Sequence, residues 1–232
     1  CGKKQLERKM IRISKVRKLD GIRSWSLQAR ETCAGSLDQE TGELVDACKG
    51  CYAAFGQYLY SNVKEPRLEN REDWKTADWE DRMVAAIHKF PFFRWYDSGD
   101  CYSVSLAKKM LNVMKRTPNT QHWFPTRMYK FAKFVSVFAE MNSLPNVVVR
   151  FSSDSIIGEF TKGLHGSTIL PTREYATDGV SVCEAYENEG KCNGCRKCWN
   201  KEIPVIGYVI HGRVAKSKFC LLYTSDAADD TP

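Results

Sequence analysis

Seven of the ten cysteines gather in two groups whose spacing could hold a metal. The first group is Cys33, Cys48 and Cys51, and the second is Cys183, Cys192, Cys195 and Cys198. Each group contains cysteines with two residues between them, a spacing that lets two thiolates face one metal while backbone amides bond the sulfurs. The basic start of the sequence has no apolar leader segment, so we expect a reducing compartment. There, clustered cysteines bind metal more often than they form disulfides.

The first group offers three thiols and no obvious fourth. Such a set suggests either an iron–sulfur cluster with one open iron or a zinc site completed by another ligand. Cys101 is the nearest candidate for that ligand, because it follows Asp100 at the end of an expected strand. Of these alternatives we favour the iron–sulfur cluster, and zinc is the main competing interpretation.

The second group carries the stronger spacing signal. Cys192, Cys195 and Cys198 form a C-x2-C-x2-C run, and eight residues separate Cys183 from it. The run is similar to the spacing around cubane clusters in ferredoxins. A zinc site needs the same four thiolates, so the spacing leaves iron–sulfur and zinc both open.

A regular alternation of strands and helices accompanies these groups. Before the alternation we expect short β-leaning pieces at 10–13 and 24–27, a loop over 29–51 and helices over 52–63 and 76–89. The alternation itself runs strand, helix, strand, helix, strand over 91–96, 103–115, 122–124, 129–141 and 147–151. After Gly158 the pattern weakens, and one more strand is expected over 204–210. This order predicts an α/β fold with a parallel sheet, closed or open, and helices outside it.

Polar or small residues stand where the expected strands end. Ser98, Gly99 and Asp100 follow the first strand of the alternation, Thr126 and Arg127 the second, and Ser152 and Ser153 the third. Functional groups in parallel sheets sit at this carboxyl edge, so we expect a site there. We also expect Asp100 to cap the helix that follows it, and Asp97 to have no catalytic role.

The composition is that of an ordinary globular protein with a basic excess. A hydrophobic fraction of 43% and a charged fraction of 27% are both typical of this class, and no apolar run reaches the ~18 residues of a membrane helix. Residues 220–232 resemble a translated sequencing adapter, and setting aside Asp226, Asp229 and Asp230 moves the net charge from +7 to +10. A basic surface suits a nucleic acid or another phosphate-bearing partner. Much of the excess of basic residues lies in the first 30 residues. A basic soluble protein without a phosphate-bearing partner is therefore an equally good interpretation of the charge.

Several motifs occur together between residues 22 and 211. They are Trp25-Ser26-Leu27, Cys33, Cys48-Lys49-Gly50-Cys51-Tyr52-Ala53, Phe93-Arg94, Asp97-Ser98-Gly99-Asp100 and Cys192-x2-Cys195-x2-Cys198-Trp199. As a set they resemble the phage gene product 88 family. Phage families that resemble radical S-adenosylmethionine (SAM) enzymes carry a similar C-x2-C-Y-A segment after an upstream cysteine. The resemblance implies a partial βα barrel of radical-SAM type with a C-terminal cysteine-rich segment.

This resemblance also implies roles for individual residues. The first cysteine group would ligate three irons of a 4Fe–4S cluster, whose fourth iron would chelate SAM. The residues that would contact SAM are Tyr52, Ser98, Gly99, Asp100, Arg127 and Ser152. The 98–100 segment would receive the amino group, Arg127 or Ser152 the carboxylate or ribose, and Tyr52 the adenine. The second cysteine group would hold an auxiliary cluster, and an external donor would supply electrons. Here fourteen residues separate the first two cysteines, where radical SAM enzymes usually have three.

The sequence therefore divides into four parts. They are a basic N-terminal segment over 1–21, a βα core over 22–182, a cysteine-rich segment with a final strand over 183–219, and the adapter-like residues 220–232. We favour reductive cleavage of SAM on an unknown substrate in the host cytoplasm, and charge together with the phage resemblance suggests a nucleic acid as that substrate. Two alternatives stay open: a zinc-stabilised nucleic-acid-binding module, and an electron-transfer iron–sulfur protein without SAM.

Overall fold

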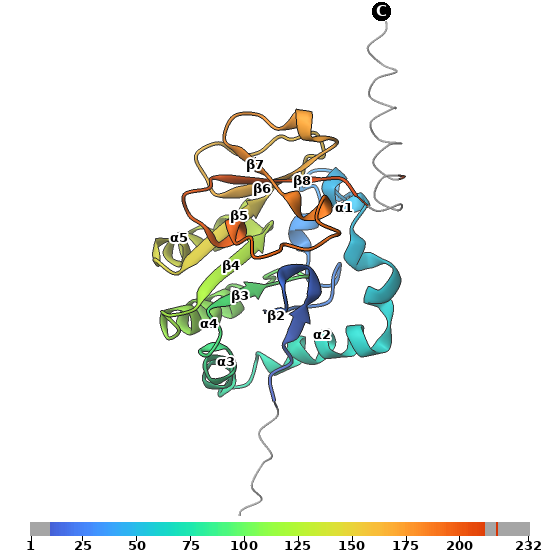
Figure 1. The fold of residues 1–232 in the computed structure, drawn as a ribbon. Helices are drawn as coiled ribbons and strands as arrows, with labels where there is room; N and C mark the ends of the chain where they lie inside the picture. Colours follow the sequence, from blue (N-terminus) through green and yellow to red (C-terminus); the bar gives the residue numbers. More distant parts are fainter. Residues whose placement is uncertain (1–9, 212–216, 218–232) are drawn as a thin grey trace, which may run out of the picture.

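One open eight-stranded sheet organises the computed structural model, which describes residues 10–211 and 217 (Figure 1). The strands are β1 (Ser14–Val16), β2 (Ile22–Trp25), β3 (Phe92–Trp95), β4 (Gln121–Thr126), β5 (Val147–Ser152), β6 (Gly166–Leu170), β7 (Val180–Val182) and β8 (Val205–Val209). Their order is β1-β2-β3-β4-β5-β6-β8-β7, and every pair after the antiparallel β1–β2 pair is parallel. The expected α/β fold with a parallel sheet is confirmed in its open form, because the sheet does not close into a barrel.

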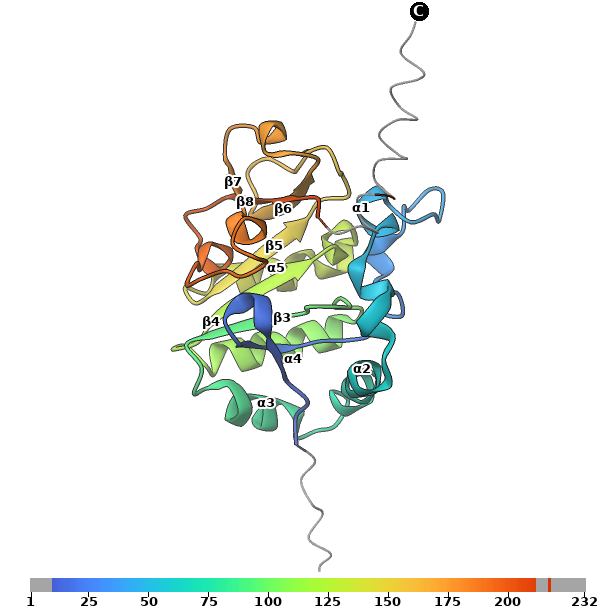
Figure 2. The same ribbon diagram turned by 45° about the vertical axis from the view of Figure 1, so that its right-hand side comes forward.

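Strands β2 to β6 lie side by side in chain order, and this order determines on which face of the sheet the connecting helices lie. Right-handed crossovers between parallel strands in chain order place the connecting helices on one face of the sheet. Helices α3 (Trp79–Ile87), α4 (Val104–Lys115) and α5 (Val135–Ser143) lie together on that face (Figure 1, Figure 2). We call the opposite face of the sheet the inner face.

Alternating side chains of the strands build the main core against these helices. Trp25, Phe93 and Trp95 point to the helix face and are fully buried. The Trp25 ring meets Trp79 of α3 edge-on at 5.5 Å between centroids and Trp95 at 6.2 Å, a favourable arrangement for aromatic pairs. Because side chains alternate along a strand, Phe92 and Arg94 project from the inner face instead.

The C-terminal cysteine-rich segment covers part of the inner face. Trp199 packs edge-on against Phe92 at 5.6 Å and Trp123 at 5.2 Å, and its indole N–H donates to the carbonyl of Phe93 at 2.9 Å. Leu19, in the turn between β1 and β2, completes this second, smaller core. Residues from the start and the end of the described chain therefore lie together over the middle of the sheet (Figure 2).

Several expected elements differ from the observed ones. The prediction of a helix over 52–63 is wrong. Two 3-10 turns, Tyr52–Ala54 and Gly56–Leu59, precede α2 (Ser61–Asp73). Gly56 has a φ of 57°, which is incompatible with a continuous α-helix. The helix expected from residue 129 begins only at Val135, after two 3-10 turns. The strand expected at 10–13 lies at β1, and β6 and β7 were not expected.

The remaining expected strands and helices are present within a few residues of their expected bounds. Among the described residues, no helix combines the length and the apolarity needed to cross a membrane. The prediction that residues 220–232 are an adapter sequence falls on residues outside the described part of the chain.

Candidate metal centre

The loop that carries Cys33 is bound to the carboxyl ends of β3 and β4. The hydroxyl of Thr32 donates to the carbonyl of Gln28 at 3.0 Å and accepts from the backbone N–H of Asp100 at 3.2 Å. Gly35 lies directly on the backbone of Arg127, and its carbonyl accepts from the ammonium group of Lys130 at 2.9 Å. The segment around Cys33 is therefore fixed between two strand ends.

The segments around Cys48 and Cys51 reach the same edge of the sheet. Cys48 belongs to the short helix α1 (Asp46–Lys49), in which the N–H of Ala47 donates to the carbonyl of Asp154 just beyond β5 at 2.9 Å. After Cys51, the hydroxyl of Tyr52 donates to the carbonyl of Asp97 just beyond β3 at 2.6 Å. Each of the three cysteines thus has a neighbour within two residues that bonds to a strand end.

The three thiols are free, and they influence one another. Burial raises the pKa of Cys33 to about 12, with further contributions from Asp100, Cys51 and Cys48. Burial also raises the pKa of Cys48, while the nearby positive charge of Arg127 opposes that rise. The sulfur atoms are therefore near enough to feel each other's charge, and without a cation Cys33 and Cys48 are neutral thiols at pH 7.

In the structure, these side chains do not form a complete metal site. Within the described part of the chain, no three His, Cys, Asp or Glu side chains are arranged closely enough to hold a metal ion. The donor set fits an iron–sulfur cluster or zinc in kind, since both prefer thiolates, and all three thiols sit at one edge of the sheet.

Cys101 does not join the first group. Its side chain is fully buried in the main core, and its thiol donates to the carbonyl of Ser103 at 3.6 Å. Burial, followed by the charge of Asp100, raises the pKa of this thiol well above its usual range. We therefore place Cys101 among the core residues.

The segment Ser98-Gly99-Asp100 holds the cysteine loop in place. The hydroxyl of Ser98 donates to the carbonyl of Leu27 at 2.8 Å, and Gly99, with a φ of 74°, lies so close to Leu27 that a Cβ atom would be 2.7 Å from its carbonyl oxygen. The Asp100 carboxylate accepts from the N–H groups of Cys101 and Arg127 at 2.7 and 2.8 Å and from the hydroxyl of Thr126 at 2.7 Å.

These contacts correct the expectation that Asp100 caps the following helix, and they bear on the expectation that it contacts the amino group of SAM. Asp100 does not cap helix α4, whose N-cap is Ser103 without a side-chain bond. Burial raises the pKa of Asp100, although its three hydrogen bonds oppose the rise. Three donors from the protein already bind its carboxylate oxygens, so an ammonium group of a ligand would have to share these oxygens with them.

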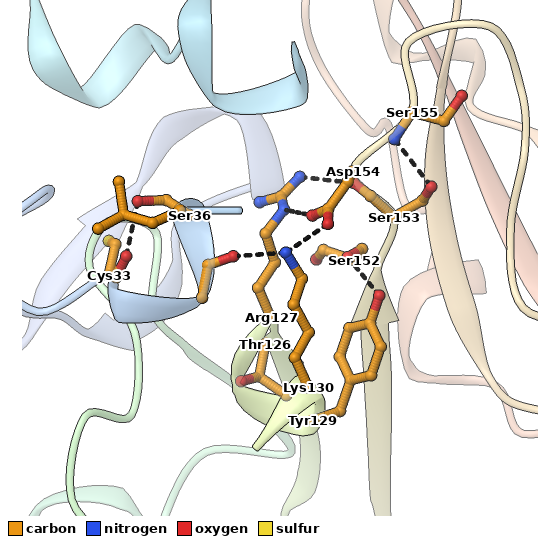
Figure 3. A network of polar contacts seen from close by, with 12 residues as sticks. Cys33, Ser36, Thr126, Arg127, Tyr129, Lys130, Ser152, Ser153, Asp154 and Ser155 are labelled. Atoms are coloured by element: carbon orange, nitrogen blue, oxygen red, sulfur yellow. Dashed lines mark hydrogen bonds and ion pairs between the residues drawn. The ribbon is translucent and has the colours of Figure 1, made fainter. Parts of the chain in front are cut away.

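Arg127 and Ser152 lie in a polar network beside the Cys33 loop (Figure 3). Arg127 donates to the carbonyl of Ser153 at 2.8 Å and pairs with Asp154 at 3.3 Å, and Lys130 also pairs with Asp154. In Figure 3 the two basic side chains reach across from the end of β4 toward Asp154 at the end of β5. The sequence reasoning did not assign Lys130 or Asp154 to the site, although Asp154 stands three residues past the expected strand 147–151.

Asp97 lies in a second network on the other side of the loop. It accepts a hydrogen bond from the hydroxyl of Ser26 and pairs with the buried guanidinium of Arg67 at 3.2 Å. The ring of Tyr58 lies 4.9 Å from that guanidinium. Asp97 thus joins the end of β2 to helix α2.

The second cysteine group lies near the turn between β1 and β2. The N–H of Cys195 donates to the carbonyl of Cys192 at 2.9 Å, with Asn193 and Gly194 both at positive φ. Asp20 accepts from the N–H of Gly194 and from Arg196, both at 2.9 Å. A turn of this kind brings the thiols of a C-x2-C pair to the same side.

The thiols of this group influence one another's pKa, although they do not form a closed metal site. Burial raises the pKa of Cys192 to about 11, and Cys183 and Cys198 add to the rise. Burial raises the pKa of Cys198 as well, while Tyr208, 3.4 Å from its sulfur, opposes that rise. All four are free in the structure, so both cysteine groups stay available for a metal.

Arg150 fixes this segment to the sheet. Its side chain is fully buried on the inner face of β5, and its guanidinium makes six hydrogen bonds, all to backbone carbonyls. The acceptors are Gly166, Lys197, Cys198, Asn200, Ile203 and Pro204, at 2.8 to 3.4 Å. One side chain therefore holds the chain on both sides of Trp199.

Comparison with known proteins gives one match. A family model described as gene product 88 matches residues 2–220, which is nearly the whole sequence. No curated protein and no solved structure matches the chain significantly.

Proposed function

The chain belongs to the gene product 88 family, and we propose that this member is an iron–sulfur protein of the radical SAM type. Cys33, Cys48 and Cys51 would hold a 4Fe–4S cluster that has one iron free of protein thiolate. When bound, such a cluster would supply the electron that cleaves SAM at its sulfonium group. The substrate would lie against the same edge of the sheet.

One observation carries this proposal. Three free cysteines from a single loop lie at the carboxyl edge of parallel strands, and a neighbour of each bonds to a strand end. The nearest other cysteine, Cys101, is turned into the core. A three-thiolate set at the edge where parallel sheets carry their sites favours a cluster with an open position over a closed zinc site.

The residues around the three thiols would prepare them for a cluster. Arg127 and Lys130 place positive charge near Cys48 and oppose the rise in its pKa, which favours the thiolate that a metal requires. Thr32, Gly35 and Asp100 hold the loop in position. Burial of Cys48 keeps water away from one side of the site.

The contacts within the protein change which residues we assign to SAM. We assign Ser98, Gly99 and Asp100 to positioning of the cysteine loop, because their polar groups are engaged there. Tyr52, a residue that is 58% exposed, and Ser152, which is partly exposed, keep surface that a ligand could contact. Arg127 could bind a carboxylate only in competition with Asp154.

A second metal site at Cys183, Cys192, Cys195 and Cys198 is favoured by the turn between Cys192 and Cys195. Its positive-φ residues turn the chain back on itself, as tetrathiolate sites require, and Arg150 fixes the segment that follows. We propose an auxiliary iron–sulfur cluster here, with structural zinc as the alternative that uses the same donors.

Metal analysis of anaerobically purified protein tests both sites. We expect about eight irons per chain if both groups hold cubane clusters, or about four irons and one zinc if the second group holds zinc. The electron paramagnetic resonance signal of the reduced cluster should change when SAM is added, and 5′-deoxyadenosine should form. Stoichiometric zinc without iron would overturn the iron–sulfur proposal. Intact clusters without any response to SAM would instead indicate an electron-transfer protein.

A further inference from the structure

An open cavity with a volume of about 430 Å³ lies beside Cys33. Its lining also includes Arg30, Glu31, Leu37, Leu44 and Tyr102. None of the residues that we assign to SAM lines it. Small-molecule sites in proteins are concave and mostly apolar, and they carry a few polar groups that orient the ligand. The cavity beside Cys33 has this composition, so we asked which ligand its walls would accept.

Two leucines on a short hairpin form an apolar wall of the cavity. Leu37 and Leu44 pair with each other as an antiparallel bridge, and the N–H of Val45 donates to the carbonyl of Ser36 at 2.9 Å to close the hairpin. Side chains directly opposite each other in an antiparallel pair lie on the same face, so the two leucines lie together. Leu37 is 39% exposed, which leaves apolar surface available to a ligand.

Tyr102 forms an aromatic wall that is fixed by its neighbours. Its hydroxyl accepts from the indole N–H of Trp74 at 2.8 Å, and the guanidinium of Arg71 lies 5.8 Å from the centroid of its ring. The same guanidinium pairs with Glu31 at 2.9 Å. The negative charge of Glu31 at the cavity is therefore offset by Arg71, and the tyrosine ring is held in a defined orientation.

Arg30 brings a positive charge to the cavity and forms no ion pair with any described residue. It is exposed, and its guanidinium lies 6.0 Å from the centroid of the Phe55 ring. Its backbone has a φ of 67°, a left-handed conformation that glycine and asparagine adopt more readily than arginine. An arginine stands here although its backbone conformation favours a smaller residue. A cation beside an apolar cavity suits a ligand that carries a negative charge.

We propose that this cavity binds the substrate, a small molecule with an aromatic body and one anionic group. The aromatic body would pack against Tyr102 and the leucine pair, and the anionic group would pair with Arg30. Because Cys33 lines the same cavity, the bound molecule would lie against the first cysteine group. Only its role as substrate rests on the proposed function, since the binding itself does not depend on which metal this group holds. A nucleotide and an aromatic acid share this chemistry.

Fluorescence titration of the full chain with anilinonaphthalene sulfonate, an aromatic probe with one sulfonate group, tests the cavity. We expect saturable binding and displacement of the probe by adenosine monophosphate or by indole acetate, and the competitor that acts identifies a nucleotide or an aromatic acid as the class of ligand. Arg30→Asn should weaken binding by about tenfold or more, without loss of stability, because asparagine suits the left-handed backbone. The control is Arg17→Asn, which changes an exposed arginine outside the cavity and should leave the affinity unchanged.

A second pair of variants tests the apolar wall. Leu37 and Leu59 are both exposed leucines, but only Leu37 lines the cavity. Leu37→Ser should weaken binding by about threefold or more through the lost apolar contact, and Leu59→Ser should not change it.

The outcomes separate this inference from the proposed function. Absence of saturable binding, failure of both competitors, or unchanged affinity in Arg30→Asn and Leu37→Ser would overturn the cavity as a binding site, even in a protein that holds iron. Saturable binding to a protein that holds zinc and no iron would instead leave the binding site standing and overturn the proposed function.

Discussion

Gly35 lies against the backbone of Arg127 so closely that a Cβ atom at position 35 would be 2.6 Å from the Arg127 carbonyl oxygen. No real Cβ makes such a contact, so only glycine allows the Cys33 loop to rest on the end of β4. The N–H of Gly35 also donates to the sulfur of Met128 at 3.3 Å. This contact decides how close Cys33 comes to the sheet.

Gly35→Ala should therefore displace the loop. We expect a loss of stability of about 2 kcal/mol, typical of overpacking, together with a clear loss of iron from the first site. Urea unfolding and iron analysis after anaerobic reconstitution measure the two effects. Ala34→Ser, a mild change at the exposed neighbouring position, should change neither quantity. Wild-type iron content in Gly35→Ala would show that the glycine contact does not position Cys33.

Cys101 should prove unnecessary for metal binding. Cys101→Ala removes a core thiol and should lower stability by about 1 kcal/mol, with the iron content unchanged. Cys48→Ala should instead remove about four irons, the content of one cubane. Parallel iron analysis and electron paramagnetic resonance distinguish the two outcomes. Loss of the first metal in Cys101→Ala would revive the four-thiolate zinc interpretation.

Arg150 should be needed to hold the cysteine-rich segment over the inner face of the sheet. Arg150→Lys keeps the positive charge, but an ammonium group has three N–H donors in place of five and cannot reach all six carbonyls, so buried carbonyls would lose their donors. We expect a loss of about 3 kcal/mol or more and faster proteolysis between residues 183 and 203. Arg116→Lys, at an exposed position, should have no measurable effect. An equal protease sensitivity in the two variants would contradict this role.

The bonds of His122 fix its tautomer. The indole N–H of Trp95 can only donate, so Nδ1 of His122, 3.3 Å away, must accept. Nε2 then carries the proton and faces the hydroxyl of Thr117 at 2.9 Å, which itself donates to the carbonyl of Val113. A second proton on this ring would place an N–H against the N–H of Trp95.

His122 should accordingly make stability depend on pH. Burial lowers its pKa from 6.5 to about 3, so the unfolded chain binds the proton more readily than the folded one. The contribution is complete above pH 6.5 and is lost as the pH falls toward 3, by at most about 1.4 kcal/mol per pH unit. Urea unfolding at pH 7, 6 and 5 measures the slope. His122→Gln should flatten it relative to the wild type, and identical slopes would exclude this histidine as the cause.

The sequence was informative where a local pattern decides the structure. Asp100 and Arg127 each follow a strand of the alternation, and parallel pairing brings such ends to one edge. They are joined there by a 2.8 Å hydrogen bond. The pattern could not reveal that the Asp100 carboxylate binds groups of the protein itself, because two of its three donors, Thr126 and Arg127, come from a different strand end.

Long-range contacts explain most of what sequence reasoning missed. Arg150 stands inside an apolar strand, and five of its six acceptors lie between residues 197 and 204, so nothing local marks it as a clamp. Strands β6 and β7 have weak strand patterns, and both pair with β8, which lies between them. Helix α2 is polar and contains Pro66, so its period is faint in the sequence.

The contact between Asp20 and the 194–196 turn has a consequence for the order of folding. The partners are 174 and 176 residues apart, so β1 and β2 leave the ribosome long before the segment that will lie beside them. Until residues 192 to 204 follow, Phe92 and Trp123 lack the cover that Trp199 gives them on the inner face. The layer of helices can form during synthesis, whereas the other side of the sheet must wait for its last partner. An incompletely synthesised chain would present an apolar surface that the finished protein hides.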